Sequence, residues 1–480
     1  MITLLAIKWA TVGIQVAQLL LALSILVVLH EFGHYITAKW FGCRVEKFYL
    51  FFDPWFSVVK KKVGETEYGI GWLPLGGYVK ISGMIDESMD KEAMKLPPKP
   101  YEFRSKPAWQ RLIIMLGGVI MNVLVAFVIY AMVLYTWGDS KVKYDATKDT
   151  IAINDCLMYE IGFRNGDKVL TVNGDSIHYE NELNREILLG KTANVERDGK
   201  VVTLNFPVAL LGKLIEKKKG SKMGATLIDV RRPAIAGEFN TKDTTSGAMV
   251  AGIKKFDKIV SVNNYPVQYQ DQIKIAILKV KRKDTAFVKV VRGADTLAVA
   301  VKLSEDWRLG LPPLSGNEMD SLHYLNIVKK EYGFFSAFPA GVQRTGEQLV
   351  FYVRQFKKIL SPETGAYKGV GGFRNMGRLF TAEWDWYYFW NITALLSVIL
   401  AFMNLLPIPG LDGGHVVFTL FEMITGKKPG EKFLEKAQIF GMVILFGLMI
   451  YANGNDWLGW GKSKPDAKPQ DQECHLSYNP

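Results

Sequence analysis

Two histidines and a glutamate lie within one short segment, in the order His30-Glu31-Phe32-Gly33-His34. On a helix, this spacing puts the two imidazoles on nearly the same face, one turn apart. Two neutral imidazoles suit Zn²⁺, and the glutamate between them can act as a general base. The segment therefore indicates a metal-dependent hydrolase that takes one more ligand from elsewhere in the chain.

The residues before this motif, 14–29, are almost entirely apolar. Such a stretch is typical of a membrane-spanning helix, and ionisable residues inside a span usually have a function. The plainer interpretation is a polar cluster that only stabilises helix packing. It is disfavoured because burying His30, Glu31 and His34 in lipid without a metal is expensive. We therefore expect a zinc site within the membrane.

A second group of chemically useful residues lies in 404–415, where Asn404 is followed by two prolines and Asp412. Prolines and glycines cannot continue a regular helix, so we expect the helix to break and to present Asp412 from a loop. Alone, this aspartate would be interpreted as a turn residue. Together with the histidine pair it becomes the candidate third ligand. For His415 a supporting or interface role is favoured over ligation, and Asn404 has the alternative role of a helix cap.

The bulk composition favours several domains, because the chain has 480 residues. The mean hydropathy of +0.08 is too low for a chain that lies wholly in a membrane. We therefore expect a polytopic α-helical membrane protein with four transmembrane helices, the zinc site lying between the first and the third. The predicted spans are 12–38, 109–135, 386–415 and 436–453.

The distribution of basic residues predicts the topology. The net charge is +12, and lysine and arginine are frequent in 39–108, between the first two spans. By the positive-inside rule this segment is cytoplasmic, which places both termini and 140–385 outside. His30 then lies about 24 Å along a span that crosses roughly 30 Å of hydrocarbon. The site is expected near the cytoplasmic face, with Asp412 at a similar depth. Nucleic-acid binding is not expected, since no basic stripe is interleaved with aromatic residues.

The outer region contains an internal repeat, seen in 162–174 and 252–264. Each copy has a turn with an acidic residue, an alternating apolar strand and a turn that begins with Asn, followed by a helix-like segment. Two α+β modules are predicted, at 145–210 and 230–305, which serve either as spacers or as peptide-binding or gating units. A helical juxtamembrane region is predicted at 306–385, and a disordered tail at 461–480.

The two motifs together resemble the site-2 protease family of intramembrane zinc metalloproteases. The two modules resemble PDZ domains, which makes the chain similar to the bacterial regulator-of-sigma-E protease type. The resemblance implies that His30, His34 and Asp412 ligate one zinc ion and that Glu31 activates the attacking water. It also implies that Asn404 steadies the substrate or the reaction intermediate.

The resemblance further implies a membrane re-entrant β-hairpin within 39–108, which presents an edge to the substrate. It would include 49–56 and 68–79, although 51–54 departs from the commoner glycine-rich form. A helical substrate hides its carbonyls and must unwind, and a strand-like edge can hold it extended by β-addition. The candidate residues for binding the substrate or the intermediate are Asn404, Pro407, Pro409, Gly76, Gly77 and Tyr78.

The expected function is that of an intramembrane zinc metalloendopeptidase of the bacterial inner membrane. The resemblance implies that its substrates are single-pass membrane proteins, such as an anti-sigma factor or remnant signal peptides, after a first extracytoplasmic cut. The modules would exclude bulky substrates or bind a peptide. The alternative is a non-proteolytic PDZ-type scaffold, against which Glu31 argues because a scaffold needs no general base. A zinc transporter would require polar residues along several spans, whereas here they gather at one depth.

Overall fold

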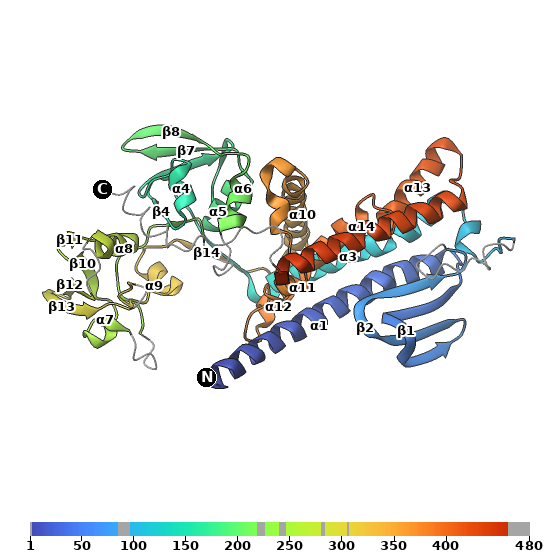
Figure 1. Cartoon of the computed structure of the whole chain (residues 1–480), viewed down its shortest axis with the longest axis horizontal. Coiled ribbons are helices and arrows are strands. Elements are labelled where there is room, and N and C mark those ends of the chain that lie inside the picture. The colour runs from blue at the N-terminus through green and yellow to red at the C-terminus, as the bar shows by residue number, and fades with distance from the viewer. Residues whose placement is uncertain are drawn as a thin grey trace. The chain divides into compact units, whose positions relative to one another are not determined.

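The computed structural model describes residues 2–84, 97–217, 226–239, 246–279, 284–304 and 307–458 (Figure 1). The chain divides into two compact units. The first unit comprises 1–139, 331–357 and 369–461, and the second comprises 140–330, 358–368 and 462–480. The tail expected to be disordered, 461–480, lies outside the described residues.

The first unit contains four helices that are long and apolar enough to cross a membrane, counted over the described ranges. They are α1 (Ile2–Trp40), α3 (Ala108–Trp137), α12 (Trp386–Leu405) and α14 (Glu431–Leu458). Helices α1, α3 and α14 contain the predicted spans 12–38, 109–135 and 436–453, whereas α12 ends at Leu405, before the end of the predicted span 386–415. The expectation of four membrane-length helices is therefore confirmed.

Helix α3 is the centre of this unit, because it packs against α1, α12 and α13 (Asp412–Thr425). Its apolar face joins a cluster with Leu26 of α1 and with Phe389 and Leu396 of α12. The approach to α1 is closest at two glycines. A methyl group on Gly117 would lie 2.6 Å from the Gly33 carbonyl oxygen, so the two backbones touch there. The glycine within the histidine motif is thus required by packing.

Asp412 is the first residue of α13, so the expectation that a loop presents it is wrong. The predicted break is present, since α12 ends at Leu405. The chain can turn tightly between α12 and α13 because Gly413 and Gly414, at the start of α13, have no side chains. Methyl groups at these positions would lie 2.2 Å and 2.7 Å from the carbonyl oxygens of Leu406 and Ile408. A helix N-terminus favours a carboxylate, which suits Asp412.

Two long strands, β1 (Val45–Val63) and β2 (Thr66–Ile81), follow α1. Both strands bend, and the first half of β1 pairs with two parts of β2, since Tyr49 lies opposite both Gly69 and Tyr78. The pair therefore folds into an antiparallel sheet of four segments, with the end of β2 at one edge. The bend in β1 coincides with Phe51 and Trp55, whose φ angles are 66° and 78°.

The second unit contains two modules with the same strand arrangement. The first has a four-stranded sheet in the order β6-β5-β7-β8, and the second has one in the order β11-β10-β12-β13. The first sheet comprises β5 (Lys168–Val172), β6 (Asp175–Ser176), β7 (Thr192–Arg197) and β8 (Lys200–Asn205). The second comprises β10 (Lys258–Val262), β11 (Tyr265–Pro266), β12 (Thr285–Arg292) and β13 (Asp295–Lys302).

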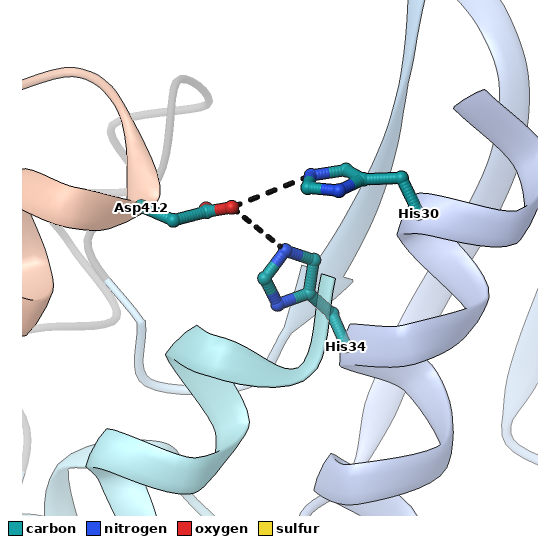
Figure 2. Close-up of side chains that lie close together, drawn as sticks. All are labelled: His30, His34 and Asp412. Atoms are coloured by element: carbon teal, nitrogen blue, oxygen red, sulfur yellow. Dashed lines mark hydrogen bonds and ion pairs between the residues drawn. The ribbon is translucent and has the colours of Figure 1, made fainter. Parts of the chain in front are cut away.

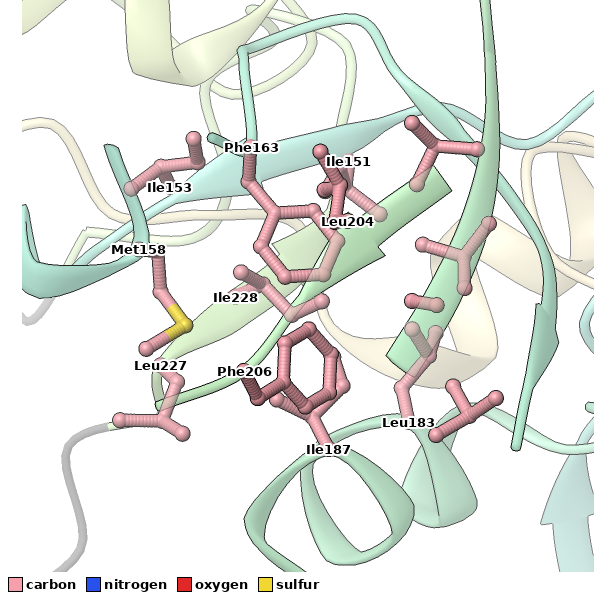
Figure 3. Close-up of a cluster of buried hydrophobic side chains, with 14 of the residues drawn as sticks. Ile151, Ile153, Met158, Phe163, Leu183, Ile187, Leu204, Phe206, Leu227 and Ile228 are labelled. Atoms are coloured by element: carbon pink, nitrogen blue, oxygen red, sulfur yellow. The ribbon is translucent and has the colours of Figure 1, made fainter. Parts of the chain in front are cut away.

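Each module has its own hydrophobic core. The first core runs from Tyr144 to Val230 and includes Phe163 and Ile187 (Figure 3). It includes a strand beyond the predicted module boundary, because β4 (Ile151–Ile153) pairs with β9 (Ile228–Val230). The second core runs from Ala234 to Leu309. The helices of the two modules are α4 (Cys156–Glu160), α5 (Glu180–Leu189), α6 (Leu210–Lys217), α7 (Gly247–Val250) and α8 (Gln270–Lys279).

The region 306–385, which the sequence predicts to be helical, contains α9 (Gly316–Ser321), α10 (Phe334–Ile359) and α11 (Phe373–Gly377). The remaining elements are η1 (Phe103–Ser105), η2 (Pro362–Thr364), η3 (Ala366–Gly369) and the paired strands β3 (Asp139–Val142) and β14 (Ile327–Lys330).

The same buried ion pair stabilises both modules. Arg197 Nε donates to Asp167 Oδ1 at 2.7 Å, and Arg292 Nε donates to Asp257 Oδ1 at 2.7 Å. Both carboxylates are 1% exposed, and each also accepts a backbone N–H three residues earlier in the chain. The repeat in the sequence thus corresponds to two copies of one turn, each tied to its own hairpin.

We expect Asp257→Asn to destabilise the second module in a pH-dependent way. Burial raises the pKa of the Asp257 carboxyl, but hydrogen bonds from Arg292 and from the Lys254 N–H outweigh it and hold the pKa below its usual value. The carboxylate therefore stabilises the fold above its unfolded pKa of about 3.9, and this stability is lost as the pH falls through the folded pKa. The expected cost at pH 7 is about 1 kcal/mol.

Hydrogen exchange of residues 258–262 in the full chain, corrected for intrinsic rates, measures this cost. The difference between wild type and Asp257→Asn should shrink as the pH falls below about 4. Asp295→Asn, at the exposed start of β13, is the control and should have little effect. A difference that stays constant from pH 3 to pH 7 would contradict the prediction.

Candidate metal centre

Three side chains from two helices converge on one point. His30 and His34 extend from α1, and Asp412 Oδ2 lies 3.3 Å and 3.2 Å from their Nε2 atoms (Figure 2). One ligand atom from each residue lies within 4.8 Å of the others, and the described ranges contain no second such group of metal-ligating residues. Two imidazoles and one carboxylate form a typical zinc donor set that leaves a fourth position open.

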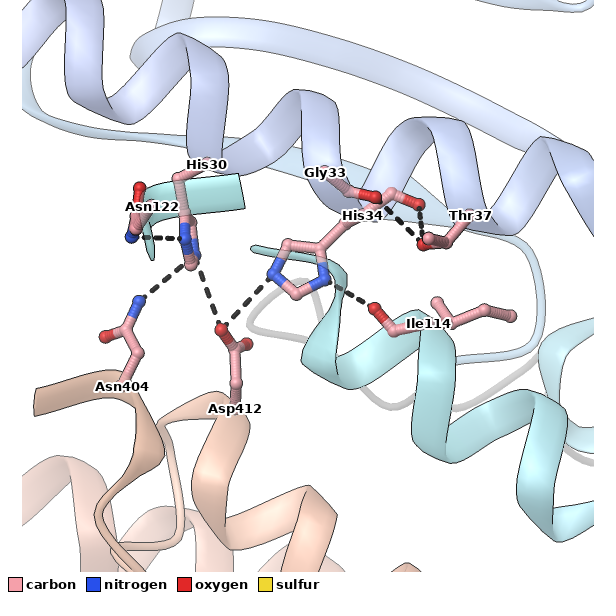
Figure 4. Close-up of polar contacts among 8 residues, drawn as sticks. All are labelled: His30, Gly33, His34, Thr37, Ile114, Asn122, Asn404 and Asp412. Atoms are coloured by element: carbon pink, nitrogen blue, oxygen red, sulfur yellow. Dashed lines mark hydrogen bonds and ion pairs between the residues drawn. The ribbon is translucent and has the colours of Figure 1, made fainter. Parts of the chain in front are cut away.

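The ring of His34 is oriented by the backbone of α3. Its Nδ1 lies 2.8 Å from the carbonyl oxygen of Ile114, which can only accept a hydrogen bond (Figure 4). The proton of the neutral ring is therefore on Nδ1, and Nε2 is left as the free electron-pair donor. This is the nitrogen that faces Asp412.

His30 lies between two amide side chains. Asn122 Nδ2 lies 3.0 Å from its Nδ1, and Asn404 Nδ2 lies 3.1 Å from its Nε2 (Figure 4). The predicted residue Asn404 is thus at the site, at the end of α12. The sequence analysis missed Asn122, although a polar residue in the middle of an apolar span was a usable signal.

Gly118 is a second residue that the sequence analysis missed. A methyl group at this position would lie 2.4 Å from both His34 Nε2 and His30 Cε1. Helix α3 therefore passes directly against the two rings, and only glycine leaves room for them. No local pattern in the sequence distinguishes this glycine from Gly117, which meets the backbone of α1 instead.

Glu31 and the edge of the β1–β2 sheet lie beside the same site. The Glu31 carboxylate lies close enough to His30, His34 and Asp412 for their charges to act on it, and the backbone of Val79 is its neighbour in β2. A methyl group on Gly77 would lie 2.7 Å from Val27 and 3.5 Å from Glu31. The sheet edge thus runs along α1 at the level of the motif.

The other predicted substrate-binding residues have different environments. The Tyr78 hydroxyl donates to Asp53 at 2.8 Å, within the sheet. Gly76, with a φ angle of 152°, faces the Phe52 ring. Pro407 and Pro409 lie in the turn between α12 and α13, and the Pro409 carbonyl abuts Gly441 of α14. His415 is not part of the converging group.

A buried ion pair fixes α13 against α3. Arg111 Nη2 donates to Glu422 Oε1 at 2.5 Å, and the two side chains are 9% and 18% exposed. The pair lies three turns along the helix that begins at Asp412. The ion pair and the tight turn at Gly413 therefore together determine the position of the Asp412 carboxylate.

Comparison of the sequence with those of known proteins identifies a family and relatives. The profile of peptidase family M50 matches residues 18–448. The regulator of sigma E protease of Haemophilus influenzae is 27% identical over 471 residues, covering 92% of this chain and 98% of the relative. Protease RseP of Yersinia pestis is 27% identical over 475 residues, covering 95% and 99%. A Vibrio cholerae protein whose name describes it as a zinc metalloprotease is 27% identical over 461 residues, covering 91% and 97%.

The family match extends over most of the chain, which therefore belongs to peptidase family M50. The protein is a zinc metalloprotease, and its converging imidazoles and carboxylate fit that metal. Its four membrane-length helices and its relatives make it an intramembrane protease of a bacterial inner membrane. The resemblance inferred from the two motifs is confirmed.

Replacing Gly118 by alanine is expected to abolish metal binding, because the added methyl group would overlap both histidine rings. Overpacking of this kind typically costs about 1–3 kcal/mol, and displacing the rings would relieve it. Zinc content of the purified protein, measured by mass spectrometry after dialysis, should fall at least tenfold. Ile120→Ala, on the exposed face of the same helix, is the matched control. Full zinc occupancy in a folded Gly118→Ala protein would refute this account.

Proposed function

We propose that this protease cleaves the transmembrane segments of single-pass membrane proteins after a first cut outside the membrane. The observation that supports this most is the position of the candidate metal group between membrane-length helices, beside a sheet edge. Relatives named regulator of sigma E protease favour an anti-sigma factor as one substrate. Remnant signal peptides are a second substrate class with the same single-span chemistry.

In this proposal His30, His34 and Asp412 hold one zinc ion. Zinc bound there would supply a Lewis acid, which would polarise the scissile carbonyl and make a water molecule easier to deprotonate into a nucleophile. The Glu31 carboxylate, which lies beside both histidines, takes the proton of the attacking water and passes it to the departing amine. The Asn404 amide, next to His30, donates a hydrogen bond to the carbonyl oxygen as negative charge develops.

The substrate is held extended along the sheet edge. A transmembrane helix satisfies its own backbone groups, so a scissile bond becomes accessible only after local unwinding. Among the described residues the end of β2 pairs with β1 on one side only, and it runs past Glu31 at Gly77. Backbone pairing at this edge would replace the lost helical hydrogen bonds. The turn with Pro407 and Pro409 would border the extended segment on the side of Asp412.

We infer the orientation in the membrane from the distribution of charge. Basic residues are concentrated between α1 and α3, so this side is proposed to be cytoplasmic and the metal centre to lie near it. The two repeated modules and both termini would then be extracytoplasmic. We propose that the modules are PDZ-like and exclude substrates that still carry a bulky outer domain. Their matching sheets and separate cores support a pair of small domains.

The general-base assignment predicts that Glu31→Gln keeps zinc but loses cleavage. The change removes a proton acceptor without altering shape, and such a loss typically costs 10²- to 10⁴-fold in rate. Zinc content and cleavage of a transmembrane test substrate are measured in detergent. His34→Ala should lose both. Cleavage by Glu31→Gln at the wild-type rate would exclude this role, and absence of cleavage by the wild type under all conditions would favour the scaffold alternative.

The exclusion role predicts a change in selectivity rather than in chemistry. A protein lacking 145–305 should cleave untrimmed substrates, while its cleavage of trimmed substrates stays within about threefold of the wild type. Both are measured in cells by following fragments of a tagged substrate with and without its outer domain. Unchanged resistance of the untrimmed substrate would contradict the exclusion role.

A further inference from the structure

Asn122 lies in the middle of a membrane-length helix and is completely buried. Its Nδ2 is 3.0 Å from His30 Nδ1, whereas its Oδ1 has no hydrogen-bond partner among the described residues. A buried amide that is only half satisfied is expensive in an apolar environment. The residue is therefore placed for a purpose other than filling space.

The hydrogen-bonding capacity of His30 shows how this amide must be oriented. Both ring nitrogens face an amide nitrogen, from Asn122 on one side and from Asn404 on the other. A neutral imidazole has one acceptor nitrogen and one N–H donor, so it cannot accept at both. One of the two amides must therefore present its oxygen to the ring. The nitrogen and oxygen of a side-chain amide occupy nearly the same positions when the amide is turned by about 180°. Exchanging them therefore leaves the shape of the side chain unchanged.

Metal binding decides which amide presents oxygen. His30 Nε2 faces Asp412, so ligation through Nε2 puts the ring proton on Nδ1. Nδ1–H then needs an acceptor, which the Asn122 oxygen provides. His30 would match His34, whose Nδ1–H already donates to the Ile114 carbonyl. Both acceptors lie on α3, which contributes no ligand of its own.

The position of Asn122 is itself fixed by a third helix. Ser397 of α12 donates its hydroxyl hydrogen to the main-chain carbonyl oxygen of Asn122 at 2.7 Å, and both residues are fully buried. Gly118, one turn earlier on α3, leaves the space into which the histidine rings extend. A continuous set of contacts thus connects α12, α3 and α1 at the level of the metal group.

We propose that Asn122 is a positioning residue of the metal centre, whose Oδ1 accepts the Nδ1–H of His30 and so fixes Nε2 as the metal-binding atom. The proposal rests on the assignment of His30 as a ligand under the proposed function. Groups that orient a metal-binding histidine typically contribute 10- to 100-fold in metal affinity. The role is distinct from packing, because it depends on an acceptor atom and not on volume.

The test compares Asn122→Asp, which keeps an acceptor, with Asn122→Leu, which keeps the approximate volume without one. Zinc affinity of the full-length protein in detergent is measured by chelator competition, together with the absorption spectrum of the Co²⁺ form. Asn122→Leu should bind zinc 10- to 100-fold more weakly and show an altered cobalt spectrum. Asn122→Asp should bind at least as tightly as wild type. Val123→Ala, on the exposed face of α3, is the matched control.

Equal affinities in wild type and Asn122→Leu would overturn the proposal, as would equal losses in Asn122→Asp and Asn122→Leu. If Asn122→Leu does not fold, ¹⁵N-histidine spectra of the zinc-loaded wild type decide, since the chain has only six histidines. They should show a protonated Nδ1 and a metal-bound Nε2 for His30, and the reverse assignment would refute the role. Unchanged zinc affinity in His30→Ala would instead refute the ligand assignment of the proposed function.

Discussion

The contact between the backbones of α1 and α3 is the constraint on which the rest of the site depends. At Gly33 and Gly117 the two helices approach more closely than any side chain would allow. This distance brings the Ile114 carbonyl and the Asn122 amide within hydrogen-bonding range of the two histidines. In an apolar bundle, buried polar groups are costly unless they have hydrogen-bond partners, and α3 supplies one partner to each histidine.

The close approach of α1 and α3 also explains why α3 needs two adjacent glycines, Gly117 and Gly118. Gly117 allows the backbones to touch, and Gly118, on the next position around α3, makes room for the imidazole rings. Adjacent residues on a helix point in directions about 100° apart, so the pair serves two different neighbours. Helix α3 thus positions the two histidine rings, and α1 and α13 supply the candidate metal ligands.

The sequence predicted the parts that depend on local spacing or on long apolar runs. His30 and His34 are one turn apart in any helix, and the four spans need only length and hydropathy. Asp412 was predicted as a ligand because it follows a helix break and because its expected depth in the membrane matches that of the two histidines. The parts that depend on how distant segments meet were missed. Nothing near Gly118 in the chain indicates that an imidazole lies opposite, and Asn122 differs from its neighbours only as a polar residue within an apolar span.

Two other differences have the same cause. Helix α13 resumes directly at Asp412 because glycines pack against carbonyls of the preceding turn, which proline and glycine counts cannot reveal. The β1–β2 pair bends back on itself at residues with positive φ, so a predicted hairpin becomes a sheet of four segments. In the second unit the repeat was visible in the sequence, and the pair of Asp257 with Arg292 has the same geometry as the pair of Asp167 with Arg197.

The contact between α14 and the turn before Asp412 has a consequence for how the enzyme is made. At Gly441 there is no space for even one methyl group against the Pro409 carbonyl, so the turn and α14 fit as complementary surfaces. Synthesis proceeds from the N-terminus, and α14 is the last of the four spans to enter the bilayer. Until it arrives, the turn that leads into Asp412 lacks its support. The turn that leads into Asp412 can therefore reach its final packing only after α14 has been synthesised.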